Sequence, residues 1–194
     1  MTDGRLRPRC RRFALALLTL CGLATIGPIP AQAQSLADLA AAVVKIKAFV
    51  PADARSAQTL GAEREGSGVV IDQNGLVVTI GYLILEAMAA EVTAADGKVY
   101  PAQVAGYDHE SGFGLLKTLQ PIKVKPVALG SSTELKEKEG VVVASSGGKE
   151  MMGPALVVSR RTFAGSWEYL LVDAIFTSPP HPAWSGAALL NRDG

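Results

Sequence analysis

The sequence has very few cysteines, and it has none after residue 33. Its 194 residues include two, Cys10 and Cys21, and both lie near the N-terminus. Disulfide bonds, a thiol nucleophile and a thiolate metal site are therefore excluded from residues 34–194. A domain in this part of the chain has to be stabilised by its hydrophobic core alone.

The apolar run near the N-terminus is too short for a membrane helix. It extends from Phe13 to Gly27, 15 residues, whereas about 20 are needed to cross a bilayer. Five arginines precede the run and Ala-Gln-Ala follows it at 31–33, which is the pattern of a secretory signal peptide cleaved after Ala33. We therefore expect residues 1–33 to be a signal peptide, no stable membrane span after its cleavage, and a periplasmic protein.

An excess of positive charge is also missing once this segment is set aside. The sequence has 19 Lys and Arg and 18 Asp and Glu residues, of which five arginines and Asp3 lie in residues 1–33. The remainder has 14 basic and 17 acidic residues, a net charge of about −3. Nucleic acid binding relies on clustered basic contacts with phosphates, so no nucleic acid partner is expected.

Long helical periodicities are absent, and short β-rich runs take their place. After a short helix-compatible segment from Ser35, residues 43–50 alternate as a first strand. Asn74-Gly75 and Asp96-Gly97 tolerate positive φ and predict two-residue hairpin loops, which join 69–71 to 76–78 and 91–94 to 99–104. Further strands are expected at 114–118, 141–144, 155–159, 169–174 and 187–191. A connector at 120–126 divides these strands into two halves, so an all-β fold is predicted.

The last two residues, Asp193-Gly194, form a third hairpin signal with no strand after it. Either the sequence is a fragment, or the strand at 187–191 is left with an exposed edge.

Four segments carry a resemblance to a known family. They are GSGVVIDQNGLVVTIGYLI (66–84), DGKVYPAQVAGYDHESGFGLLK (96–117), VALGSSTELKEKEGVVVASSGG (127–148) and PHPAWSGAALLN (180–191). In this order they resemble the trypsin-like serine proteases of the HtrA/Deg type. The resemblance implies a protease domain at 34–194 with a trypsin-like double β-barrel: a first barrel at about 41–120 and a second at about 126–194, incomplete at its C-terminal end.

The resemblance places the family's catalytic histidine at Tyr82, its aspartate at Gly112 and its nucleophile at Ser185. Only the serine is retained. A phenol, which titrates near pH 10, stays protonated at neutral pH, and a glycine orients no base. The family's oxyanion-hole glycine is Ala183 here, and its β-carbon disfavours the left-handed backbone open to glycine. Ser185 is therefore interpreted as the remnant of a nucleophile.

Two histidines remain as substitute bases. His109 lies three residues before the aspartate position and would serve only if its loop moved towards Ser185; the alternative is a solvated loop histidine. His181 stands between two prolines and is interpreted as a surface residue of a rigid turn. Asp108, His109 and Glu110 are adjacent, so their side chains point to opposite faces of an extended segment. No metal site and no cofactor is expected.

Trp184 and Tyr82 both fall where the resemblance places the protease cleft. Two interpretations stay open: the two rings fill the cleft with aromatic surface, or they pack into the space that the catalytic triad has left.

The sequence thus predicts an exported trypsin-like protease homologue that binds peptide or protein without cutting it. One alternative is an active serine endopeptidase that uses Ser185 with a substitute base. Another is a structural or assembly domain that uses an exposed edge strand. The sequence sets neither the oligomeric state nor the identity of the partner.

Overall fold

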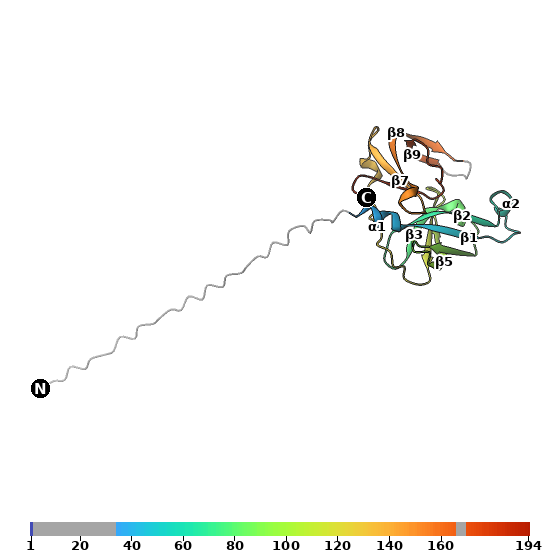
Figure 1. The fold of residues 1–194 in the computed structure, drawn as a ribbon, viewed down its shortest axis with the longest axis horizontal. Helices are drawn as coiled ribbons and strands as arrows, with labels where there is room; N and C mark the ends of the chain where they lie inside the picture. The colour runs from blue at the N-terminus through green and yellow to red at the C-terminus, as the bar shows by residue number, and fades with distance from the viewer. Residues whose placement is uncertain (2–33, 166–169) are drawn as a thin grey trace. The chain divides into compact units, whose positions relative to one another are not determined.

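The computed structural model describes Met1, residues 34–165 and residues 170–194. Apart from Met1, the predicted signal peptide at 1–33 lies outside the described residues, and so does Tyr169, the first residue of the predicted strand 169–174. Figure 1 shows that the domain starting at residue 34 is built from two β-rich halves.

The first half is a closed six-stranded barrel. Its strands pair in the order β1-β2-β3-β6-β5-β4, and every pairing is antiparallel. The strands are β1 (Val43–Phe49), β2 (Glu63–Val70), β3 (Leu76–Ile80), β4 (Ala89–Thr93), β5 (Val99–Tyr107) and β6 (Phe113–Thr118). Closure gives each of these strands a partner on both sides.

Alternation along the strands decides which side chains enter the barrel. In β1, Val44 and Ile46 are fully buried, whereas Lys45 points outward and its Nζ lies 2.8 Å from a carboxylate oxygen of Glu65. Each strand contributes buried side chains to one apolar core, for example Ile46, Val70, Val77, Val92, Tyr100 and Leu116. The expected strand at 43–50 is therefore present as β1. Successive side chains of a strand point to opposite faces, so alternate residues of β1 face the core and the solvent.

Both predicted hairpins are present, but their loops are longer than two residues. Between β2 and β3, residues 72–75 separate Ile71 from its partner Leu76. The Asp72 carboxylate accepts the N–H of Leu76 at 3.0 Å, and this local turn accommodates the two extra residues. Between β4 and β5 the loop has three residues, 95–97, and Gly97 takes its left-handed position with φ of 83°.

The second half is an open, antiparallel sheet with the order β10-β7-β8-β9. Its strands are β7 (Gly140–Ala144), β8 (Met152–Ala164), β9 (Leu170–Ser178) and β10 (Ala188–Leu190). Within the described residues, β10 pairs with β7 and β9 pairs with β8. A closed barrel and a second sheet confirm the predicted all-β fold class.

The β8–β9 hairpin is longer than the strands predicted at 155–159 and 169–174. Its pairing runs from Leu156 opposite Ser178 to Ala164 opposite Leu170. The apolar pattern stops at the polar residues 159–162, so the sequence signal ended there. Pairing with β9 carries β8 through this polar stretch, because backbone hydrogen bonds do not depend on side-chain polarity.

Short helices complete the fold: α1 (Leu36–Ala42), α2 (Ala57–Leu60), α3 (Gly81–Ile84), η1 (Ser132–Glu134) and η2 (Lys149–Met151). The Ser35 hydroxyl caps α1 by accepting the N–H of Asp38 at 3.1 Å. Leu39 of α1 packs with Ala144 and Leu190 in a second apolar cluster, which joins α1 to β7 and β10. The expected connector at 120–126 contains neither helix nor strand.

Candidate functional site

The structure brings Tyr82 and Ser185 into direct contact although they are 103 residues apart. The two side-chain hydroxyls lie 2.5 Å from each other, and either one can donate the hydrogen bond. Tyr82 belongs to α3, directly after β3, and Ser185 precedes β10. Two of the three positions singled out by the sequence thus meet where the two halves of the domain come together.

Ser185 is held against β2 by close main-chain packing. Its carbonyl oxygen accepts the N–H of Ser67 at 2.8 Å. A β-carbon on Gly66 would lie 2.7 Å from Ser185 Oγ, so only glycine fits beside this hydroxyl. Gly186 has φ of 70°, and a β-carbon there would come within 2.0 Å of the Ser67 carbonyl oxygen. The Gly66-Ser67 pair therefore fixes the backbone around Ser185.

Ser67 is the centre of a buried hydrogen-bond network that the sequence analysis missed. Its Oγ accepts the N–H of Ser146 at 2.9 Å, and its carbonyl oxygen accepts the hydroxyl of Thr79 at 2.7 Å. Ser67 is only 2% exposed. A small polar residue between two glycines on a barrel strand was the available signal, but its partners lie 12 and 79 residues away.

Gly112 reaches the same region through its backbone. Its carbonyl oxygen accepts the N–H of Gly81 at 2.7 Å, so it adjoins the residue that precedes Tyr82. Its own N–H donates to the Asp108 carbonyl at 2.9 Å, which closes a tight turn, and its φ is 73°. A carboxylate-bearing residue at this position would occupy the left-handed region that glycine favours.

The N–H of Ala183 is engaged by a histidine of its own loop. This N–H donates a hydrogen bond to Nδ1 of His181 at 3.2 Å, so the imidazole closes the short turn between the two residues. His181 is half-buried, because the turn folds the ring back onto its own backbone. This contact spans two residues and was accessible to local sequence reasoning.

His109 lies beside Tyr107 rather than beside Ser185. The ring centroids of His109 and Tyr107 are 4.5 Å apart. Among the described residues, the Ser185 hydroxyl hydrogen-bonds to the Tyr82 side chain, and neither imidazole hydrogen-bonds to it. Trp184 is 63% exposed, with its ring 6.2 Å from that of Tyr82, so it is not packed into the interior.

Arg64 is a second residue that the sequence analysis missed. It is 4% exposed, although it carries a charge. Its guanidinium donates to the carbonyl oxygens of Tyr82 at 2.6 Å and Leu85 at 3.0 Å, and to the Ser56 hydroxyl at 2.7 Å. Burial lowers the pKa of Arg64, and the Glu86 carboxylate partly opposes this effect. Arg64 therefore anchors the C-terminal end of α3, the helix that carries Tyr82.

The Tyr82–Ser185 contact predicts coupling between the two residues. We expect Tyr82→Phe and Ser185→Ala each to lower the free energy of unfolding, and the double variant to lose less than the sum by about 0.5–1.5 kcal/mol. Urea unfolding of the four proteins measures this coupling. Tyr82→Phe combined with Thr133→Ala, whose hydroxyl contacts Ser131 instead, is the control and is expected to be additive.

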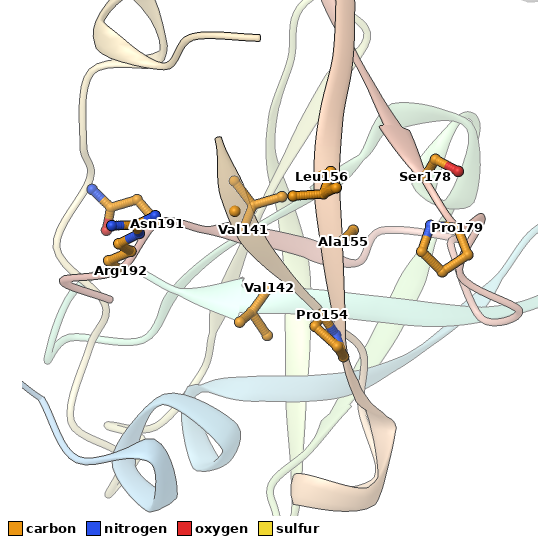
Figure 2. Close-up of a pocket in the computed structure, with 10 residues that line it drawn as sticks. Val141, Val142, Pro154, Ala155, Leu156, Ser178, Pro179, Asn191 and Arg192 are labelled. Carbon is orange, nitrogen blue, oxygen red and sulfur yellow. The ribbon is translucent and has the colours of Figure 1, made fainter. Parts of the chain in front are cut away.

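The described residues contain no cluster of three or more His, Asp or Glu side chains that would hold a metal ion. In the same part of the chain, no helix is both long and apolar enough to cross a bilayer. An apolar cleft of about 400 Å³ lies on the second sheet. Figure 2 shows Val141, Leu156 and Pro179 in its wall and Arg192 at one side. Its lining does not include Tyr82 or Ser185, so it is separate from the site described above.

Comparison with known proteins relates this site to a family. The family described as "Trypsin-like peptidase domain" matches residues 66–194. Serine protease HTRA1B of Danio rerio is 31% identical over 85 residues, which cover 44% of this chain and 18% of that protein. Mitochondrial serine protease HTRA2 of Drosophila grimshawi is 29% identical over 148 residues, which cover 66% of this chain and 32% of that protein. The chain thus spans less than a third of the length of either relative.

Solved structures show the same fold. The HtrA-type protease AlgW with tripeptide has a TM-score of 0.64 at 20% identity, over 83% of this chain and 52% of that one. Deg5 has a TM-score of 0.60 at 21% identity, over 79% of this chain and 76% of that one. Both confirm the predicted trypsin-like fold. Since the family match covers more than half of the sequence and includes Tyr82, Gly112 and Ser185, the chain belongs to the trypsin-like peptidase family, with HtrA/Deg proteases among its relatives.

Proposed function

We propose that this chain is an exported, periplasmic protease homologue that binds peptide or protein without hydrolysing it. The observation that carries the proposal is the 2.5 Å contact between the hydroxyls of Tyr82 and Ser185. The serine hydroxyl is a weak nucleophile until a base removes its proton, and a phenol is a poor base at neutral pH. Export follows from the predicted signal peptide at 1–33.

Two further features support the absence of hydrolysis. Gly112 carries no carboxylate that would orient a base, and the Ala183 N–H is engaged by His181 rather than available to an oxyanion. Loss of one oxyanion donor lowers kcat by about 10²-fold, and loss of the base alone by about 10⁶-fold. The combined deficits leave Ser185 without the groups that hydrolysis requires.

Peptide binding is the part of the family's activity that needs none of these groups. A related HtrA-type protease was solved with a tripeptide, which supports peptides as the ligand class. The backbone around Ser185 is also held tightly by Ser67, so the surface beside it is preorganised. Preorganisation favours binding because less conformational entropy is lost when a ligand docks.

The proposal predicts no Ser185-dependent hydrolysis. We expect wild-type protein and Ser185→Ala to give the same rate with labelled casein, and neither to react with a fluorophosphonate probe. Casein cleavage that disappears in Ser185→Ala would refute the proposal. In that case His109→Ala decides between the alternatives: loss of activity in His109→Ala identifies the substitute base, and retained activity excludes it.

A further inference from the structure

We propose that the aromatic side chains beside Ser185 bind an extended, proline-containing peptide that carries a basic residue. Trp184, Tyr82, Tyr107 and His109 are called the aromatic row. The inference rests on the proposed function, because it names the ligand class for the same non-cutting site.

The aromatic row runs from the Ser185 loop to the loop that follows β5. The rings of Trp184 and Tyr82 have centroids 6.2 Å apart and a tilt of 50°, and those of Tyr107 and His109 are 4.5 Å apart with a tilt of 49°. Tyr107 lies against Gly81, the neighbour of Tyr82, since a β-carbon on Gly81 would come within 2.5 Å of Tyr107 Cε2. The two ring pairs therefore lie on neighbouring parts of the fold, linked through Gly81, although their residues are far apart in the sequence.

The row is anchored on the barrel and open to solvent at both ends. Tyr82 and Tyr107 pack partly against the core of the first barrel, whereas Trp184 is 63% exposed and His109 is exposed. Burying a large ring on a partner contributes strongly to binding, and adjacent exposed rings are typical of a binding surface. The exposure of Trp184 favours the interpretation that the rings present aromatic surface beside Ser185.

Proline-rich peptides suit this surface for two physical reasons. The exposed ring of Trp184 offers a flat apolar face on which a pyrrolidine ring can stack. The polyproline II conformation is also preformed, so a proline-rich segment loses little entropy when it docks on an aromatic surface. Such a peptide needs no free strand edge for pairing, and the first barrel, which carries three members of the row, is closed.

The charge beside the row favours a basic residue in the ligand. Asp108 and Glu110 flank His109, and both are exposed. Hydrogen bonds from the Ser111 hydroxyl and the Glu110 N–H hold the pKa of the Asp108 carboxyl below its usual value, so this group is negative at neutral pH. A lysine or arginine next to the prolines would be attracted to this end of the row, and an acidic residue would be repelled.

Fluorescence anisotropy with a short labelled peptide, in which pairs of prolines alternate with arginine, tests the inference. We expect saturable binding to the full protein. Matched peptides with alanine for every proline, or glutamate for every arginine, are expected to bind at least about tenfold more weakly. Trp184→Ala is expected to weaken the proline–arginine peptide by at least about tenfold.

Phe163→Ala is the matched control, because it removes an exposed aromatic ring of β8 outside the row and is expected to leave the affinity unchanged. Urea unfolding of Trp184→Ala should match that of wild type, which separates a loss of binding from a loss of fold.

Three results of the binding experiments would contradict the inference. Equal affinity for the proline and alanine peptides, unchanged affinity in Trp184→Ala, or no binding of the proline–arginine peptide would overturn the inference. The proposed non-cutting function would survive each of these results. Cleavage of the probe by wild type but not by Ser185→Ala would contradict the proposed function itself.

Discussion

Replacing Arg64 with methionine is expected to lower the free energy of unfolding by about 3–5 kcal/mol. Methionine keeps an apolar stem of similar length, so the loss reports on the guanidinium. Without it, the carbonyl oxygens of Gly61, Tyr82 and Leu85 and the Ser56 hydroxyl lose a hydrogen-bond donor. Urea unfolding followed by circular dichroism measures the change.

Arg64→Lys separates charge from geometry. An ammonium retains the positive charge but cannot span acceptors on both sides as the planar guanidinium does. We expect Arg64→Lys to lose about half as much free energy as Arg64→Met. If Arg64→Met matches wild type within about 0.5 kcal/mol, water satisfies these acceptors and Arg64 is not an anchor of α3.

The position of Arg64 also links stability to the site. Because Arg64 holds the carbonyl of Tyr82, its removal is expected to release the Tyr82 side chain from Ser185. The coupling between Tyr82→Phe and Ser185→Ala should then shrink in the Arg64→Met background. A coupling that persists unchanged would show that α3 keeps its place without Arg64.

Replacing Gly186 with alanine is the second change with a large expected effect, a loss of about 3–5 kcal/mol. Two penalties combine. The backbone at Gly186 has φ of 70°, and the added β-carbon would lie 2.0 Å from the Ser67 carbonyl oxygen and 2.8 Å from Thr79 Oγ1. Relief of this overlap requires the Ser185 loop to move away from β2, which breaks the Ser67–Ser185 main-chain hydrogen bond.

Gly97→Ala is the matched control for Gly186→Ala. Gly97 has a similar φ of 83°, but nothing lies within 4 Å of an added β-carbon. We expect Gly97→Ala to lose only about 1–2 kcal/mol, the penalty of the left-handed backbone alone. The difference between the two variants measures the close approach of Ser185 to β2. Equal losses in urea unfolding would mean that the loop shifts freely and that Ser185 is not clamped.

The strands and turns of the first barrel could be predicted because their signals are local. Alternation at 43–50 separates buried Val44 and Ile46 from exposed Lys45, and Gly97 marks a position of positive φ. Loop lengths were less accessible, because Asp72 closes a four-residue turn with its side chain. The ends of β8 were missed because interstrand pairing extends it through a polar stretch.

The sequence pointed to the residues of the candidate site but not to the contacts between them. The resemblance pointed to Tyr82, Gly112 and Ser185, and the structure brings all three into one region. The role of Arg64 was missed, although its even spacing from Val70 along β2 places it on the inward face of the barrel. A charged residue on that face requires hydrogen-bond partners. The partners of Arg64 lie outside the strands, where alternation of apolar and polar residues predicts no contacts.

The sequence by itself determined the all-β class, the absence of cysteine from residues 34–194, and the residue types at positions 82, 112 and 185. These properties follow from composition, strand period and the φ that each residue tolerates, which are local quantities. Only the tertiary structure decided that the Tyr82 hydroxyl meets Ser185 and that Arg64 anchors α3. Both contacts depend on tertiary packing, which joins segments whose separation along the chain carries no information about their distance in space.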